Sequence, residues 1–342
     1  MTSTHSRASG TSASVRVPTH LNPGPTLAFL RDLTDHFDVP RVVVDFQPLA
    51  FASPFGILLM AEALRDWAAR RITQGLTHQI VGAQDGSRPS AISYLGHVGF
   101  FTRVGTDYGK QPGEAPGSPT YVPITVLSRD ALPSGVVLQK AIDLRAQELA
   151  ALIFEDGSQR DMLQYCLREV IRNVFEHAKV HTCTLMAQRY RDGDVEIAIA
   201  DLGIGVLASL SETHRIQVPG QALKLAIKPG VSRVQATSDS DQWGNSGFGL
   251  YVLSRLGMQT GAFRLVSSGM SLEMSGSINA LGPAHFPGTA IGLRVSTRNA
   301  EYFPNLLQQL VAEGERASGA SSGSVPRRAS MMTLKSGNTA ES

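Results

Sequence analysis

The sequence predicts an α/β protein built from two blocks. Between residues 41 and 101 a strand, a helix, a strand and a helix follow one another, and this alternation is typical of a small α/β layer. Between residues 120 and 300, amphipathic helices alternate with paired strands, which favours a sheet with helices packed on it. A stretch rich in glycine and proline, residues 109–119, is interpreted as a linker or long loop. We therefore expect one domain at residues 26–108 and another at residues 120–300.

Both ends of the chain are predicted to be disordered. Residues 1–25 are rich in Ser, Thr, Gly and Pro, and residues 314–342 are rich in Ser, Gly and Ala with scattered charge. Such segments bury too little apolar surface to offset the entropy that they lose on ordering.

Composition excludes several classes of protein. The formal net charge of +2 gives no strong electrostatic reason to expect binding to nucleic acid or to an anionic membrane. The first twenty residues lack the apolar run of a signal peptide, and the most apolar stretch, residues 55–64, is too short to span a bilayer. The two cysteines, Cys166 and Cys183, lack metal-ligand spacing. We therefore expect a cytoplasmic protein with reduced thiols, without direct contact with nucleic acid or membrane.

The elements of the first block follow from local signals. The β-branched run at residues 41–46 indicates a buried strand. Ser53 followed by Pro54 is an N-cap with proline at the first helical position, so a helix is predicted from Pro54 to Arg71. The other predicted elements are a helix at 26–37, a short strand at 79–83 and a helix at 90–101.

This block resembles STAS domains, the fold of anti-sigma-factor antagonists. The resemblance covers roughly eighty residues and depends on Val43-Val44-Asp45-Phe46, Phe51-Ala52-Ser53-Pro54-Phe55-Gly56 and the run from Ile92 to Phe100. STAS antagonists carry Asp-Ser before the helix, and that serine is phosphorylated. Ser53 and Pro54 stand at those places here, so the resemblance implies that the switch site is lost. Ser53 remains either a shifted phosphoacceptor or a helix cap.

The most informative helix of the second block lies between residues 158 and 177. Its apolar residues recur at helical spacing and should face the core: Leu163, Leu167, Val170 and Val174. Between them stand Glu169, Asn173 and His177. Each step of four residues advances only about 40° around the helix axis, so these polar side chains form one stripe beside the apolar face. A stripe at this position needs either solvent or a ligand.

A predicted hairpin leads to a second polar site. Strands are expected at residues 182–190 and 195–201, and Asp192-Gly193 between them is a strong turn signal. The second strand is predicted to be half-buried, and it ends in Asp201-Leu202-Gly203-Ile204-Gly205. A carboxylate at a strand end can hold a flat base, and glycines let the backbone approach a ligand closely. A plain tight turn explains the motif equally well.

Two further glycine motifs complete the pattern. Asn245-Ser246-Gly247-Phe248-Gly249 joins a glycine-rich turn to an amphipathic helix, and free amides at a helix N-terminus bind phosphate. No Gly-Lys-Ser/Thr follows, so the turn is not a Walker A loop. Gly288-Thr289 enters a predicted strand that runs to Val295.

Taken in order, these motifs resemble the four boxes of the GHKL ATPases, from about Ser158 to Val295. The resemblance implies a Bergerat α/β two-layer sandwich that binds ATP and Mg²⁺. It makes Asn173 the magnesium ligand, Asp201 the acceptor for the adenine amino group and Thr289 a base-binding residue. The other implied contacts are the base side at Gly203 and Gly205, the phosphate turn at Gly247, Phe248 and Gly249, with Asn245 in place of the family's first glycine, and His177, which is either structural or near phosphate.

The resemblance leaves two functions open. Glu169 stands four residues before Asn173, where hydrolysing members and anti-sigma-factor serine kinases carry a general base. The chain is therefore expected to hydrolyse ATP or to phosphorylate a serine on a regulatory partner of the sigma-factor or STAS-antagonist type. The alternative is a nucleotide-gated interaction module without catalysis, and a homodimer is possible in either case.

An ATP lid is expected at residues 206–241, with a short helix at 221–227. Its cations, Lys224, Lys228 and Arg233, either reach the phosphates on closure or remain solvated.

Overall fold

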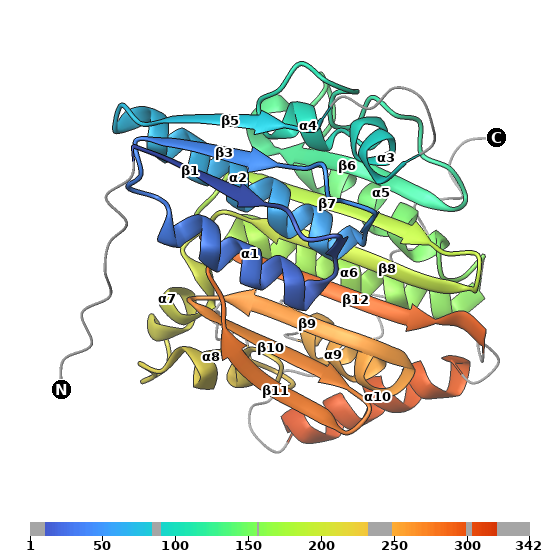
Figure 1. Ribbon diagram of the computed structural model, residues 1–342. Coiled ribbons are helices and arrows are strands. Elements are labelled where there is room, and N and C mark those ends of the chain that lie inside the picture. Colours follow the sequence, from blue (N-terminus) through green and yellow to red (C-terminus); the bar gives the residue numbers. More distant parts are fainter. Residues whose placement is uncertain (1–10, 84–89, 156, 232–247, 299–302, 320–342) are drawn as a thin grey trace.

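The computed structural model describes residues 11–83, 90–155, 157–231, 248–298 and 303–319. It is a mixed α/β structure with one seven-stranded antiparallel sheet and two small parallel sheets. In Figure 1 the three-stranded sheet and two long helices of the N-terminal block lie on one side of the large sheet. The helices of the second block lie on its other side.

The N-terminal block begins earlier than the sequence predicted. Residues 12–21, assigned above to a disordered end, form two strands, and the first of them pairs in parallel with the strand at Arg41–Asp45. The elements of this block are β1 (Ser12–Arg16), β2 (His20–Leu21), α1 (Pro23–Asp35), β3 (Arg41–Asp45), β4 (Phe51–Ala52), α2 (Pro54–Thr73), β5 (Thr77–Val81), α3 (Ala91–His97) and α4 (Phe100–Arg103). The sheet order is β1-β3-β5, and β2 pairs with β4.

The start of α2 agrees with its sequence signals. Ser53 is the N-cap, and its side chain accepts a hydrogen bond from the backbone N–H of Gly56 at 3.3 Å, while Pro54 occupies the first turn. The helix end is also fixed, because the buried guanidinium of Arg71 donates to main-chain carbonyls that include those of Val39 and Thr77. These bonds attach the helix to the loop after α1 and to β5.

The helix predicted at residues 90–101 is two helices. Ser90 caps α3 through a reciprocal pair of hydrogen bonds with Ser93. Gly99 then takes a left-handed conformation with φ of 89°, and α4 begins at Phe100. Glycine adopts this conformation at low cost, so Gly99 turns the chain where helical periodicity alone predicted continuity.

The second block forms the large sheet and the helices on it. Its elements are β6 (Tyr121–Ser128), a 3₁₀ turn (Arg129–Ala131), α5 (Leu138–Ala151), α6 (Gly157–His177), β7 (Thr182–Arg189), β8 (Asp194–Asp201), α7 (Gly205–Ser211), α8 (Pro219–Ala226), α9 (Gly249–Thr260), β9 (Gly261–Ser267), β10 (Met270–Ser275), β11 (Ile278–Pro283), β12 (Thr289–Ser296) and α10 (Phe303–Gly319). The strand order is β11-β10-β9-β12-β8-β7-β6, and every neighbouring pair is antiparallel.

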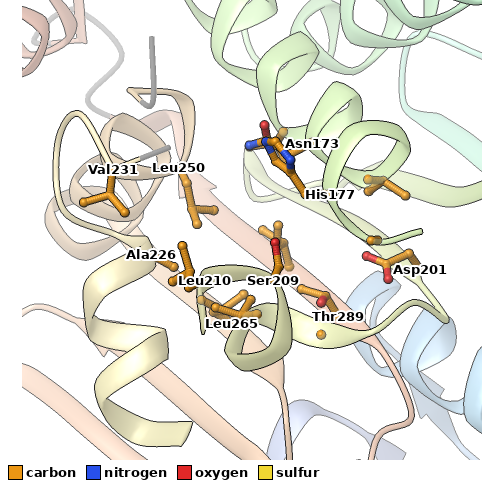
Figure 2. Close-up of a pocket in the computed structure, with 16 residues that line it drawn as sticks. Asn173, His177, Asp201, Ser209, Leu210, Ala226, Val231, Leu250, Leu265 and Thr289 are labelled. Atoms are coloured by element: carbon orange, nitrogen blue, oxygen red, sulfur yellow. The ribbon is translucent and has the colours of Figure 1, made fainter. Parts of the chain in front are cut away.

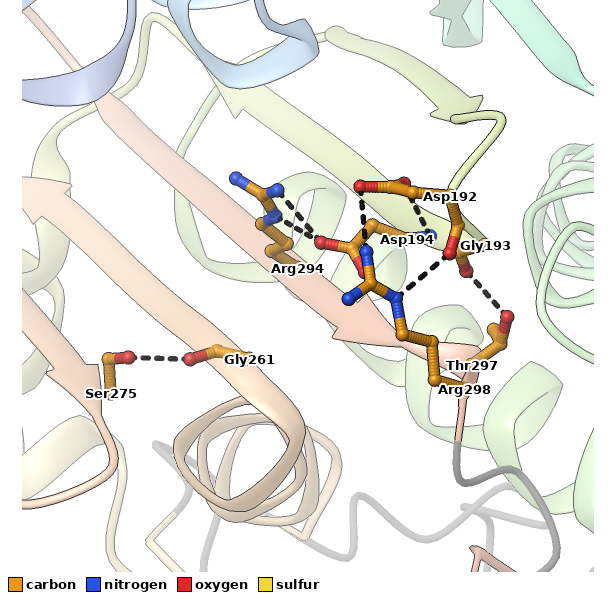
Figure 3. Close-up of polar contacts among 8 residues, drawn as sticks. All are labelled: Asp192, Gly193, Asp194, Gly261, Ser275, Arg294, Thr297 and Arg298. Atoms are coloured by element: carbon orange, nitrogen blue, oxygen red, sulfur yellow. Dashed lines mark hydrogen bonds and ion pairs between the residues drawn. The ribbon is translucent and has the colours of Figure 1, made fainter.

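The predicted hairpin between β7 and β8 is present, with Gly193 at a φ of 88°. Its tip is attached to the end of β12, as Figure 3 shows: Arg294 pairs with Asp194 at 2.8 Å, and Arg298 donates to the main-chain oxygen of Asp192. These contacts fix β8 at one end, and Asp201 stands at its other end.

β8 is buried along its whole length except at Asp194, although the sequence predicted a half-buried strand. Val195, Ile197 and Ile199 pack into the core under the helices, whereas Ala198 and Ala200 pack into the core of the N-terminal block. The small alanine side chains allow α2 to lie directly on this face, where it contacts β8, β7 and β12. The sheet is therefore covered on both faces.

Two segments predicted to be irregular are packed. In the expected linker, Gly109 lies against Gly96, Ala115 is buried, and Gly113 donates its N–H to Ile124 in β6. Residues 314–319, assigned to the disordered tail, belong to α10, where Leu310 is buried. No helix in the described part of the chain has both the length and the apolar character needed to cross a membrane.

Candidate functional site

Asn173 and His177 reach a cavity from the last turns of α6. The predicted apolar face of this helix packs in the core, with Leu163, Leu167 and Val170 almost completely buried. The polar stripe lies at the edge of that face, and both Asn173 and His177 line the cavity. The helix therefore presents a carboxamide and an imidazole beside its own apolar surface.

Asp201 is held rigidly at the end of β8. Its carboxylate accepts a hydrogen bond from the N–H of Gly203 at 2.8 Å. A Cβ atom on Gly203 would lie 2.3 Å from the carbonyl oxygen of Ala178, at the end of α6, so only glycine fits. Gly205 has a φ of 80°, and the chain turns there into α7. The glycines thus permit the turn that fixes the carboxylate.

Thr289 lies directly beside Asp201 on the neighbouring strand, because the two residues are partners in the β8–β12 ladder. The Thr289 hydroxyl lies 3.1 Å from that of Ser267, which also donates to the main-chain oxygen of Gly288 and accepts from the N–H of Val206. Ser267 is fully buried and joins the β12 entry to the start of α7. No sequence motif marks Ser267 as part of the site.

Figure 2 shows these residues around one cavity. Its polar lining comes from α6, α7 and the ends of β8 and β12: Asn173, His177, Asp201, Ser209 and Thr289. Its walls are mainly apolar, from Val170, Val174, Val206, Leu210, Ala226, Val231, Leu250, Leu265 and Ile291, and Gly205 also borders it. An apolar cavity with a few convergent polar groups is the usual form of a small-molecule site.

The Asp201 carboxyl has a shifted pKa. Burial raises the pKa from 3.8 to about 6, because a charged carboxylate loses hydration at this position. The N–H groups of Gly203 and Thr289 oppose the shift, and Glu62 of α2 adds to it. At neutral pH the group is ionised and acts only as an acceptor.

Glu169 does not line the cavity with the rest of the predicted site. It is 3% exposed, and Arg172 donates to its carboxylate at 3.2 Å. The first residue of α9, Gly249, packs on it: a Cβ on Gly249 would lie 2.8 Å from the Cβ of Glu169. The predicted general base is therefore covered by the next helix and engaged by a cation.

The predicted phosphate turn is described only in part. Asn245 and Gly247, like Arg233 of the expected lid, lie outside the described residues. Phe248 is buried as the residue that precedes α9, where its ring lies against Gly314 of α10. Its side chain serves packing at this position.

The expected lid helix is α8, and the cavity takes Ala226 from its end. Lys224 and Lys228 are exposed and do not line the cavity.

The sequence also did not identify Ser209, which lines the cavity from α7. The available signal was its position one helical turn after Gly205, on the same face of the helix.

No family model, curated protein or solved structure matches the chain. The function is therefore inferred from the chemistry of the cavity. A carboxamide oxygen suits a hard cation that keeps waters and phosphate oxygens, and a fixed carboxylate between apolar walls suits a flat ring with an amino group. Asn173 could hold Mg²⁺, and Asp201 could hold the amino group of a purine base.

Proposed function

We propose that the chain binds ATP with Mg²⁺ in the cavity between α6, α7 and the ends of β8 and β12. One observation carries the proposal: Asn173 and Asp201, from elements far apart in sequence, line the same cavity with Thr289 and Gly205. The GHKL resemblance requires this convergence, and two unrelated polar sites would not produce it.

Each lining group has a distinct task in this proposal. The ionised carboxylate of Asp201 accepts from the adenine amino group, and the aliphatic walls cover the faces of the base. Asn173 would ligate Mg²⁺, which neutralises charge on the triphosphate. Glycine at 203 and 205 keeps the turn beside the base compact.

Calorimetric titration tests the proposal directly. Wild-type protein should bind ATP in Mg²⁺ and more weakly in chelator. Asn173→Ala should abolish most of that magnesium dependence but still bind adenosine, whereas Asp201→Asn should weaken ATP and adenosine alike. Gln188→Ala on β7, outside the cavity lining, is the matched control. Binding that none of the cavity variants changes would contradict the proposal.

A second candidate is a nucleotide-gated interaction module that does not turn ATP over. The observation that favours it is the cover over Glu169, since a carboxylate paired with Arg172 and packed under α9 is poorly placed to activate a nucleophile. In this reading, nucleotide occupancy alters docking of a regulatory protein, of the sigma-factor or STAS-antagonist type, in the cytoplasm.

Release of γ-phosphate separates the two candidates. For the serine kinase or ATPase, Glu169→Ala should abolish release while ATP affinity stays similar. Glu176→Ala is the control, because Glu176 also pairs with Arg172 but lies further along α6. Absence of turnover in wild type, alone and with candidate partners, would favour the interaction module.

A further inference from the structure

Ser209 is a buried polar residue of the cavity that no sequence motif identifies. It lies in the middle of α7, is 9% exposed and lines the cavity. In Figure 2 its hydroxyl oxygen points into the cavity, and its neighbours there include Leu210 and Leu265. Aliphatic neighbours of this kind offer the hydroxyl no hydrogen bond.

The hydroxyl of Ser209 makes no hydrogen bond to another residue in the part of the chain that the structure describes. Other helical hydroxyls behave differently. Ser211, two residues on, donates to the main-chain oxygen of Leu207 at 2.7 Å, and Ser254 in α9 donates to that of Tyr251 at 2.7 Å. Helical serines commonly bond back to their own helix in this way. The Ser209 hydroxyl instead points into the cavity, where it is accessible and free to bond to the occupant.

The position of Ser209 restricts which group of the occupant it meets. α7 starts at Gly205, beside Asp201, and Ser209 is four residues further on, about 6 Å along the helix axis. Asp201 takes the amino group of the base, so a residue one turn away faces an adjoining edge of the same ring. The ring nitrogens on those edges accept hydrogen bonds and cannot donate. They therefore need a donor, which the ionised Asp201 cannot be.

We propose that Ser209 is a specificity-determining residue whose hydroxyl donates a hydrogen bond to a purine ring nitrogen that flanks the amino group, N1 or N7. This inference rests on the proposed ATP site and adds a recognition contact to it. Thr289 does not replace Ser209, because its hydroxyl is already engaged with that of Ser267. In this proposal Asp201 recognises the amino group of the base and Ser209 recognises a ring nitrogen.

The test uses ATP analogues in which one ring nitrogen is replaced by a C–H group. Affinities of full-length protein are measured for ATP, 1-deaza-ATP, 7-deaza-ATP and 2′-deoxy-ATP. Wild type should bind one deaza analogue roughly three- to tenfold more weakly than ATP, the effect of one neutral hydrogen bond. Ser209→Ala should bind ATP weaker by a similar factor and should no longer distinguish ATP from that analogue. Ser211→Ala is the control and should retain the wild-type preference, because its hydroxyl bonds to its own helix.

The outcomes are separable. If wild type binds no ATP, the proposed function itself fails. If wild type binds ATP but tolerates both deaza analogues, or if Ser209→Ala keeps the discrimination, the ATP site stands and the role of Ser209 is refuted. Loss of discrimination against 2′-deoxy-ATP alone would assign the hydroxyl to the ribose and overturn the inference. The wild-type comparison needs no substitution, so it stands even if a variant folds poorly.

Discussion

Replacing Asp201 by asparagine should make the protein more stable and its cavity poorer at holding adenine. Asp201 is 6% exposed, and burial raises its pKa to about 6. Above that pH the carboxylate is charged in the folded protein, and its lost hydration destabilises the folded state. Asparagine has nearly the same shape and an oxygen that can still accept from the N–H of Gly203, but it carries no charge.

The magnitude follows from the displacement of the pKa. It rises from 3.8 to about 6, so roughly two pH units separate the folded value from the ordinary one. Each unit corresponds to about 1.4 kcal/mol, which gives an upper limit of about 3 kcal/mol. Because the folded pKa is the higher one, the folded state holds the extra proton between these values. The contribution of Asp201 to the free energy of unfolding therefore falls as pH rises through that window and is lowest above pH 6.

Urea unfolding of wild type and Asp201→Asn at pH 8 and pH 5 measures the effect. The variant should be more stable at pH 8, and its advantage should shrink at pH 5. Asp32→Asn, at an exposed site on α1, controls for the change from carboxylate to amide. A variant that is no more stable at pH 8, or whose advantage grows toward pH 5, would show that burial of the Asp201 charge does not destabilise the fold.

Binding should show the opposite preference. Adenosine is the suitable ligand, since it has no group that titrates between pH 5 and 8. Its affinity for wild type should fall as pH drops through about 6, where Asp201 takes up a proton and ceases to be a pure acceptor. Asp201→Asn should bind weakly throughout. His177 also lines the cavity, so the profile is repeated in His177→Gln, which should keep the fall near pH 6.

Two further predictions concern the packing that supports the site. Arg71→Met should destabilise the protein by about 3 kcal/mol or more in urea unfolding, because main-chain carbonyls after α1 lose a buried charged donor; Arg70→Met, at a half-exposed neighbour, should change stability by less than about 1 kcal/mol. Gly292→Ala should cost about 1–3 kcal/mol and expose α2 to limited proteolysis, because the new Cβ would lie 2.7 Å from the ring of Phe55. Gly282→Ala, where the nearest atom is 3.4 Å away, should be nearly neutral.

Local sequence signals predicted elements well where packing agrees with them. The helix from Pro54 follows from Ser-Pro capping, and the strand that ends at Asp201 follows from its apolar run and the turn before it. The convergence of Asn173 and Asp201 on one cavity was expected from the GHKL resemblance and not from local signals, which placed each residue only on its own element.

The errors have a common cause, because local sequence patterns carry no information on tertiary contacts. β1 has little apolar character, yet Val15 is buried, and pairing with β3 satisfies its backbone. Helical periodicity placed Glu169 beside Asn173 but carried no information on Gly249, whose missing side chain lets α9 close over the carboxylate. The position of a residue on a helix determines which way its side chain points, whereas access to that side chain depends on the neighbouring helix.

The contact between α2 and β8 changes what the N-terminal block can do. Ser53 is 3% exposed, and its hydroxyl donates to the main-chain oxygen of Leu21 and caps α2. Two residues on, the N–H of Phe55 donates to the carboxylate of Glu196, which is buried under the helix start with a raised pKa because it has lost hydration. A phosphoryl group on Ser53 would need both exposure of the cap and a dianion beside that carboxylate, and each is unfavourable. The geometry therefore favours the cap over the phosphoacceptor, and α2 covers the face of the sheet in which β8 carries Asp201 at its end.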